Sequence, residues 1–497
     1  MAMSDSPLCL FDNSYARLPA QFFTRQSPVP VEKPCGIRVN RALAQELGLD
    51  PDWLASPGGI AVVAGNALPD GADPIATVYA GHQFGSYNPQ LGDGRAVLLG
   101  ELVTASGRRY DWQLKGSGPT PYSRGGDGRS PLGPVLREYI VSECMHRLGV
   151  PTTRALAAAS TGELVLREQQ LPGAVLARVA SSHIRIGTFQ FFAAHRNVEA
   201  LQALADHVIA RHYPEAQDSD NPIAALLDSV VAAQAALVAK WQALGFIHGV
   251  MNTDNMLLNG ETIDYGPCAF MDEFRANQVY SSIDHGGRYA YRNQPAIAHW
   301  NLSCLAQALL PILDSDQEDA IAIAQTAVDR FPHLFLEQHS NCIAAKLGLA
   351  ELREEDSALV EDLFALLEEH HVDFTLAFRR LADLVFEEGA GPQNVAELFE
   401  FPGEMEHWLA RWRKRIAEEA DSAETLQTNM YAANPALVPR NHVVEAVIEA
   451  ATFDGNLEPF HALVDALENP HHYHPNLIYY ATPPQPEEVV RQTFCGT

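Results

Sequence analysis

Basic side chains are scarce in this sequence, and lysine is the scarcest of them. Only five lysines occur among 497 residues, and 62 Asp and Glu outnumber 34 Lys and Arg, which gives a net charge of −28. A protein that binds nucleic acid without sequence preference needs a basic surface, and so does one that is held at an anionic membrane. We therefore expect neither nucleic acid nor a membrane among its partners.

Cysteines and long apolar segments are also few. The seven cysteines are far apart and show no CxxC spacing, so neither a disulfide framework nor a zinc site is indicated. The histidine pairs at 370–371 and 471–472 are interpreted as solvated or capping residues rather than metal ligands. The first 15 residues lack the cationic and apolar regions of a signal peptide, and we find no run of about 18 apolar residues. These absences predict a cytoplasmic protein with reduced cysteines.

The chain divides into a strand-rich part and a helical part. Glycines punctuate short apolar runs up to about residue 180, which predicts strands at 95–102 and 109–114 and a hairpin of 163–167 with 174–180, turned at Leu171-Pro-Gly173. From about residue 192 the apolar spacing is helical almost to the end. We predict an α+β protein with two lobes, at 1–190 and 191–497. Helices are expected at 41–47, 130–148, 228–244, 296–310, 317–330, 357–369, 375–388, 405–419 and 442–451.

The stretch from 244 to 268 carries the most distinctive set of polar residues. A helix and a short strand lead to His248, and a polar loop then carries Asp254 and Asn255. The Asn259-Gly260 pair predicts a tight hairpin turn, whose strands would hold Asn255 and Asp264 side by side. An amide oxygen beside a carboxylate suits a hard cation bound to phosphates, Mg²⁺ or Mn²⁺. Protein kinases use an Asn and an Asp in this way.

The usual kinase base is missing from this loop. In kinases the catalytic Asp follows the His by two residues, and the metal-binding Asn follows it by seven. Here the seventh residue after His248 is Asn255, whereas the second is Val250, which cannot accept a proton. The nearest carboxylate is Asp254. The sequence therefore predicts an intact metal site without the usual base for γ-phosphoryl transfer.

Two features of the strand-rich part are candidates for phosphate contacts. Gly92 and Gly94 form a tight turn before Arg95, and such a turn allows close backbone approach to phosphate. An ordinary hairpin turn has the same composition. Lys115 ends a predicted buried strand, where kinases place the lysine that holds phosphates, and a surface lysine is the alternative.

Charged residues in the following segments could complete such a site. Glu138 lies in the predicted helix after a Gly-rich loop and is a candidate partner for Lys115, as a helix glutamate is in kinases. Glu143 competes with it on spacing. Arg178 and Arg185 lie in or beside apolar runs, and a buried arginine needs an anion. That anion is either nucleotide phosphate or a structural carboxylate.

The order of these features along the chain resembles the selenoprotein O family, the pseudokinase-like protein adenylyltransferases known in bacteria as YdiU. The likeness covers the whole chain and includes Phe11–Pro19, Gln113–Arg129, His248–Pro267 and the tail, where Cys495 stands at a position that is selenocysteine in some relatives. It implies a bilobal kinase-like fold in which ATP binds reversed, with its γ-phosphate pointing inward. AMP, or UMP in some members, is then transferred to Ser, Thr or Tyr hydroxyls of proteins with release of pyrophosphate.

The resemblance also implies roles for individual residues. Asp254 would be the proton acceptor, Asn255 and Asp264 would hold Mg²⁺ or Mn²⁺, and Glu138 would pair with Lys115. The residues implied to contact ATP (or UTP) are Gly92, Gly94, Arg95, Lys115, Asp127, Gly128, Arg178, Arg185 and Asp264.

Three functions are open on the residues alone. We favour a monomeric nucleotidyltransferase that acts on hydroxyls of other proteins, and of itself. A kinase in which Asp254 replaces the missing base would transfer the γ-phosphate instead, and a non-catalytic nucleotide-binding scaffold would bind without turnover. Family members can join the terminal cysteine to a cysteine near the activation segment. Around Tyr280 this sequence has none, and Cys268 is the nearest candidate for Cys495.

Overall fold

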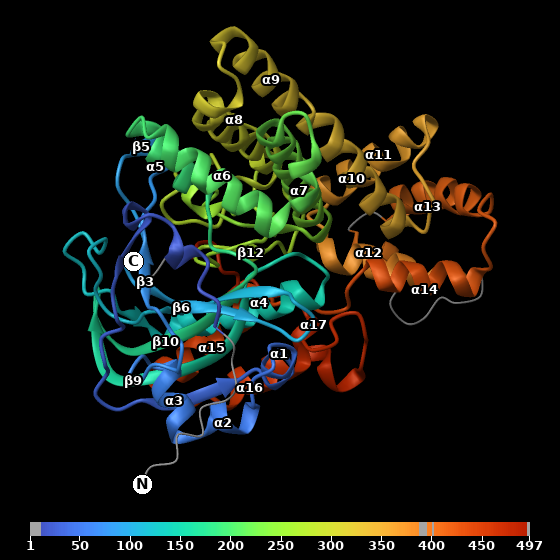
Figure 1. Ribbon diagram of the computed structural model, residues 1–497. Coiled ribbons are helices and arrows are strands. Elements are labelled where there is room, and N and C mark those ends of the chain that lie inside the picture. The colour runs from blue at the N-terminus through green and yellow to red at the C-terminus, as the bar shows by residue number, and fades with distance from the viewer. Residues whose placement is uncertain (1–10, 387–394, 400–401, 495–497) are drawn as a thin grey trace.

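The computed structural model describes residues 11–386, 395–399 and 402–494. An antiparallel sheet dominates the first 180 residues, and helices make up most of the rest (Figure 1). The chain is therefore mixed α+β, as the sequence predicts. Cys495 and its expected pairing lie outside the described residues.

The main sheet has eight strands in the order β1-β3-β6-β7-β10-β9-β2, with β8 paired to β10. Its strands are β1 (Phe23–Arg25), β2 (Cys35–Val39), β3 (Ile75–Thr77), β6 (Ala96–Val103), β7 (Arg109–Lys115), β8 (Ser130–Pro131), β9 (Arg154–Leu166) and β10 (Gln170–Ala180). The strands predicted at 95–102 and 109–114 are confirmed. The predicted turn at Leu171–Gly173 is wrong, because the chain turns at 167–169 and Pro172 lies inside β10. A register shift between Pro172 and Ala174 accommodates the proline there.

Helices cover both faces of this sheet. The bounds of the first helices are α1 (Arg41–Glu46), α2 (Pro51–Ala55), α3 (Pro57–Val63) and α4 (Leu132–Arg147). Val175 and Ala177 of β10 belong to the hydrophobic core shared with α1, α2 and α3, whereas Leu176 belongs to the core shared with α4. Since side chains alternate along a strand, Arg178 lies on the α4 face. The antiparallel register sets Lys115 of β7 opposite Leu176 and on that same face.

The second part of the chain is largely helical. Its α-helices are α5 (Ile186–Ala194), α6 (Val198–His212), α7 (Pro222–Leu244), α8 (Gln294–Leu313), α9 (Gln317–Asp329), α10 (Phe331–Leu347), α11 (Ser357–Glu369), α12 (Phe374–Asp383), α13 (Pro402–Ile416), α14 (Ala423–Ala433), α15 (Asn441–Phe453), α16 (Glu458–Ala466) and α17 (Ile478–Ala481). The red helices α15 and α16 return to the strand-rich part (Figure 1) and share the core of α4. Every predicted helix is present, although α12 ends at Asp383, before the predicted end at 388.

Two helical segments, Pro222–Leu244 and Tyr291–Leu313, are long and apolar enough by composition to cross a membrane. More than half of each apolar window is buried inside the protein. Both segments contribute many residues to the largest hydrophobic core. Packing within the helical part therefore explains their hydropathy.

The stretch after α7 is held by several short contacts rather than by a regular hairpin. β11 (Phe246–Ile247) pairs with β12 (Ala269–Phe270). The hairpin predicted around Asn259-Gly260 is reduced to a single bridge between Met256 and Thr262. Thr262 also bridges to Thr152, and Leu257 bridges to Arg185. The strand-rich part and the start of α5 thus position this stretch.

Candidate active site

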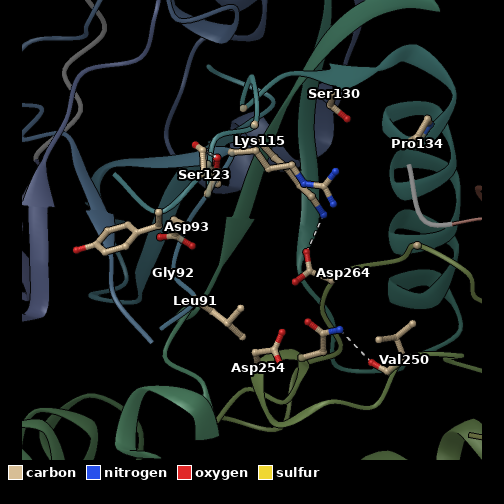
Figure 2. Close-up of a pocket in the computed structure, with 18 of the residues that line it drawn as sticks. Leu91, Gly92, Asp93, Lys115, Ser123, Ser130, Pro134, Val250, Asp254 and Asp264 are labelled. Carbon is tan, nitrogen blue, oxygen red and sulfur yellow. Dashed lines mark hydrogen bonds and ion pairs between the residues drawn. The ribbon is translucent and has the colours of Figure 1, made fainter. Parts of the chain in front are cut away.

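A cavity of about 550 Å³ lies between the sheet, α4 and the segment after α7. All the site residues predicted from the sequence line it: Gly92, Gly94, Arg95, Lys115, Asp127, Gly128, Glu138, Arg178, Arg185, Asp254, Asn255 and Asp264. In Figure 2, Asp264 lies just below Lys115, and Asp254 lies further down. The volume of the cavity falls within the range of small-molecule sites. Residues that are far apart in the sequence therefore meet at one site.

Asp264 is the centre of a charge cluster in this cavity. Its Oδ1 lies 2.7 Å from Lys115 Nζ and 2.7 Å from a terminal nitrogen of Arg178, and its Oδ2 lies 2.7 Å from a terminal nitrogen of Arg185. Burial by itself would raise the pKa of Asp264, but the three cations outweigh burial and hold that pKa well below its usual range. The three cations are thus gathered around one carboxylate at the cavity wall.

Glu138, and not Glu143, is the partner of the strand lysine. Glu138 Oε2 lies 2.6 Å from Lys115 Nζ, and its Oε1 lies 2.9 Å from Arg178. Burial opposes ionisation of Glu138, but the two cations lower its pKa. Glu143 is on another face of α4 and binds Arg154 at 2.8 Å. The competition that spacing left open is therefore decided by the face that each glutamate occupies.

The loop before Asp264 is rigidly organised by its own polar groups. His248 is buried, and its Nε2 lies 2.9 Å from the carbonyl oxygen of Ile263. The Asn255 Nδ2 donates to the carbonyl oxygen of Val250 at 3.0 Å. Asp264 itself has φ +61°, in the left-handed region that Asp tolerates better than most residues. Its carboxylate therefore leaves the chain in a direction that a regular strand would not allow.

Asp254 differs from Asp264 in its surroundings. Burial raises its pKa to about 6, against the opposing effects of Arg185 and of a hydrogen bond from Gln83. Gln83 Nε2 donates to its Oδ2 at 3.2 Å. Its Oδ1 is buried and has no hydrogen-bond partner among the described residues. A cavity carboxylate with a pKa near neutrality can take a proton from a bound hydroxyl.

The glycine turn at 92–95 depends on close packing. A Cβ at Gly92 would lie 2.9 Å from the carbonyl oxygen of Thr77, and φ there is +126°. Between the two glycines, Asp93 accepts hydrogen bonds from the amide and the hydroxyl of Thr77, at 3.0 and 2.7 Å. The turn is thereby attached to β3 and presents its backbone to the cavity. The geometry therefore favours a turn whose backbone can approach a bound phosphate over an ordinary hairpin turn.

Asn255 and Asp264 have the oxygen donors that a hard divalent cation requires. The amide of Asn255 is oriented by its bond to Val250, which leaves its side-chain oxygen as the available atom. A carboxylate offers about four lone-pair sites, and the three cations at Asp264 occupy three of them. One acceptor position on Oδ2 is left. The donor set therefore fits Mg²⁺ or Mn²⁺.

Several cavity residues were not predicted from the sequence. They are Tyr79, Gln83, Asp93, Tyr122, Arg124 and Arg167. Arg167 pairs with Asp127 at 2.9 Å, and this bond lowers the pKa of Asp127. Arg124 belongs to the Gly-rich loop, and the glycine content of that loop is the one feature of the sequence that could have indicated Arg124 as a site residue. Gln83 lies between Gly81 and Gly85, a spacing too common to indicate a site.

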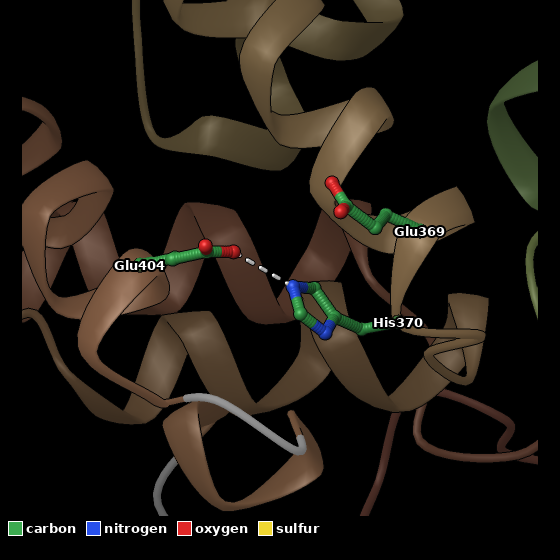
Figure 3. Close-up of side chains that lie close together, drawn as sticks. All are labelled: Glu369, His370 and Glu404. Atoms are coloured by element: carbon green, nitrogen blue, oxygen red, sulfur yellow. Dashed lines mark hydrogen bonds and ion pairs between the residues drawn. The ribbon is translucent and has the colours of Figure 1, made fainter.

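The histidine pair at 370–371 lies apart from this cavity. His370 Nε2 is 2.9 Å from Glu404 Oε2 at the junction of α11 and α13, and Glu369 lies close by (Figure 3). A hydrogen bond with Glu404 is sufficient to explain its orientation. The ring is largely shielded from solvent, and His370 is the C-cap residue of α11, so of the two interpretations the capping one is confirmed.

The chain matches known proteins over almost its whole length. Residues 8–468 match the family model described as protein adenylyltransferase SelO. The chain belongs to the SelO family. It is 57% identical over 487 residues to the protein nucleotidyltransferase YdiU of Rhodopseudomonas palustris strain BisB18, covering 98% of this chain and 99% of that protein. It is 56% identical over 487 residues to the protein nucleotidyltransferase YdiU of Bradyrhizobium diazoefficiens, again covering 98% of this chain and 99% of that protein.

Membership of the SelO family identifies the chain as a protein adenylyltransferase, that is, a protein nucleotidyltransferase. A nucleotide is therefore one substrate and a protein the other. The expectation of the family from the order of the motifs is confirmed. The kinase and scaffold alternatives are not needed to explain the site.

Proposed function

We propose that the cavity transfers AMP from ATP, or UMP from UTP, to Ser, Thr or Tyr hydroxyls of proteins. The observation that carries this proposal is the carboxyl group of Asp254, which lines the same cavity as the cluster of cations around Asp264. The acceptor hydroxyl attacks the α-phosphorus and gives its proton to Asp254. The bond from that phosphorus to the bridging oxygen breaks, and pyrophosphate leaves.

The cations of the site have matching tasks. Lys115, Arg178 and Arg185 would bind the outgoing phosphates, with Arg95 and the backbone of the turn at Gly92 and Gly94 contacting the nucleotide. Asp127 and Gly128 border the same space. Asn255 and Asp264 would hold Mg²⁺ or Mn²⁺, which neutralises phosphate charge when bound. Preorganised charges of this kind usually supply the largest share of the rate enhancement.

The arrangement supports a two-lobed, kinase-like organisation with the nucleotide reversed. Lys115 on the sheet pairs with Glu138 on α4, as a kinase lysine pairs with its helix glutamate. Val250 occupies the position of the kinase base and lines the cavity. Reversal brings the α-phosphate, rather than the γ-phosphate, toward the acceptor. We infer lobes at 1–190 and 191–497, and a monomer that works in the cytoplasm.

Labelled nucleotides test the proposal directly. The protein is incubated with an acceptor protein, Mg²⁺ or Mn²⁺, and ATP labelled at either the α- or the γ-phosphate. We expect protein-bound label from α-labelled ATP alone, a rate about 10²- to 10⁴-fold lower in Asp254→Ala, and loss of label in Asp264→Asn. Parallel reactions with UTP measure the base preference, and peptide mass spectrometry identifies the modified hydroxyl. Label from the γ-phosphate would contradict the proposal and indicate a kinase.

A further inference from the structure

A short segment of the strand-rich part is bonded to the loop that carries Asp254. This segment, residues 81–84, contains β4 (Gly81–Gln83) and is called the strap below. The amide of His82 donates to Thr253 Oγ1 at 2.7 Å, and Gln83 Nε2 donates to Asp254 Oδ2 at 3.2 Å. The amide of Phe84 donates to the side-chain oxygen of Asn252, which directly precedes Thr253 in the loop, at 3.1 Å. Three successive strap residues thus bind three successive loop residues.

The strap makes the two oxygens of Asp254 unequal. Oδ2 accepts the bond from Gln83, whereas Oδ1 is buried and without a hydrogen-bond partner among the described residues. Close packing adds to this constraint, because a Cβ at Gly81 would lie only 2.4 Å from Oδ1. The carboxylate is therefore held in one orientation, with Oδ2 bonded to Gln83 and Oδ1 packed against the backbone at Gly81.

The strap is itself anchored, so it can act as a fixed support. Gln190 of α5 joins it to the loop, since its Nε2 lies 2.9 Å from His82 Nδ1 and its Oε1 accepts from Thr253 at 2.6 Å. The amide of Ala80 donates to the carbonyl oxygen of Gly187 at 3.0 Å. β4 also pairs with β5 (Ser86–Asn88) across a tight turn. Gln83 therefore projects from a support whose position does not depend on Asp254.

We propose that Gln83 is a positioning residue for nucleotide transfer, which holds the Asp254 carboxylate through Oδ2 in the orientation from which it accepts the proton of the acceptor hydroxyl. The inference rests on the proposed role of Asp254 as proton acceptor. Gln83 acts through that carboxylate and does not itself exchange a proton with the substrate. A base displaced by about 1 Å can lose on the order of 10²-fold in rate. The loss should therefore fall on turnover, while nucleotide binding is kept.

The test compares Gln83→Met, which keeps the length of the side chain but removes its donor, with Gln90→Met, an exposed glutamine just beyond the hairpin. Transfer rates from α-labelled ATP are measured over a range of ATP concentrations. We expect Gln83→Met to lower kcat about 10- to 100-fold with KM for ATP changed less than about twofold, and Gln90→Met to behave as wild type. A rise in KM with unchanged kcat would overturn the inference.

A double-mutant cycle separates positioning from other roles. In an Asp254→Ala background the carboxylate is absent, so Gln83→Met should change the residual rate less than about twofold. A further loss of about 10-fold or more would show that Gln83 acts independently of Asp254, which overturns the inference. A wild-type protein that transfers no α-label would instead overturn the proposed function, and this inference with it.

A crystal structure of the Gln83→Met variant gives a readout that does not require activity. We expect the Asp254 carboxylate to rotate or to shift from its wild-type position. A carboxylate that keeps its position and orientation in the variant would overturn the inference, even if the rate were reduced.

Discussion

Lys346 is a buried lysine without an ion-pair partner among the described residues, and we expect that its replacement by methionine stabilises the protein. It lies near the end of α10 with 3% of its surface exposed. Its Nζ is 4.2 Å from the ring centroid of Phe378 and 5.4 Å from that of Phe374. Among the described residues, no ion pair joins it to a carboxylate, and the Cys342 thiol is the neighbouring group that opposes the effect of burial on its pKa. Burial lowers its pKa to about 7, which means that burying the charged amine costs stability. Lys346→Met removes the charged amine and fills the same space.

The magnitude follows from the difference between the folded and unfolded pKa values. The lysine has a pKa of about 7 when folded and 10.5 as its ordinary value, so the unfolded chain binds more protons between these limits. The free energy of unfolding therefore rises with pH between these two pKa values. Below pH 7 the lysine is charged in both states, and its burial destabilises the folded protein by the full amount. The difference corresponds to about 4 kcal/mol at pH 7 and about 1.4 kcal/mol at pH 9.5. Cation–π contacts offset up to about 2 kcal/mol of it.

Urea unfolding at pH 7 and pH 9.5 measures the effect. Trp408 and Trp412 belong to the hydrophobic core that contains both phenylalanines, so tryptophan fluorescence reports its unfolding. Lys346→Met should be more stable than wild type by about 2–4 kcal/mol at pH 7, and the difference should shrink at pH 9.5. Lys414→Met, at an exposed position of α13, is the control and should change little. A variant less stable than wild type, or a difference independent of pH, would refute the reasoning.

Two further predictions concern the site. Glu138→Gln removes a carboxylate shared by two of the cavity's cations, so the free energy of unfolding should fall by about 3–5 kcal/mol and the ATP affinity by about tenfold, as measured by calorimetry. Glu143→Gln is the control and should leave the ATP affinity unchanged. Equal losses of affinity in both variants would contradict the assignment of Glu138 as the partner of Lys115. Gly81→Ala places a Cβ 2.4 Å from Asp254 Oδ1, so the transfer rate should fall on the order of 10²-fold without loss of ATP binding. Gly58→Ala is the control, because position 58 has room for a Cβ, and it should be as active as wild type. Wild-type activity in Gly81→Ala would show that packing against Asp254 is unimportant.

Local patterns in the sequence predicted most elements because those elements depend on near neighbours. Alternation and helical spacing located β6, β7 and α4. Prediction failed where a strand tolerated a turn-like sequence, at Leu171–Gly173, because a bulge between long strands accommodated the proline. It also failed at Asn259-Gly260, where contacts with Thr152 and Arg185 replaced a regular hairpin. Tertiary contacts outweighed local turn preferences at both places.

The sequence by itself determined which chemical groups the site contains, because the order of lysine, glutamate, arginines, asparagine and aspartate is a property of the chain. The pairing of those groups came only from the tertiary structure. Glu138 was selected over Glu143 because it faces β7 and β10, whereas Glu143 faces the start of β9, and strand register set Arg178 and Lys115 on one face of the sheet. The bond from Gln83 to Asp254 joins residues 171 positions apart. No local pattern encodes such a contact, because it exists only once the two parts of the chain have packed together.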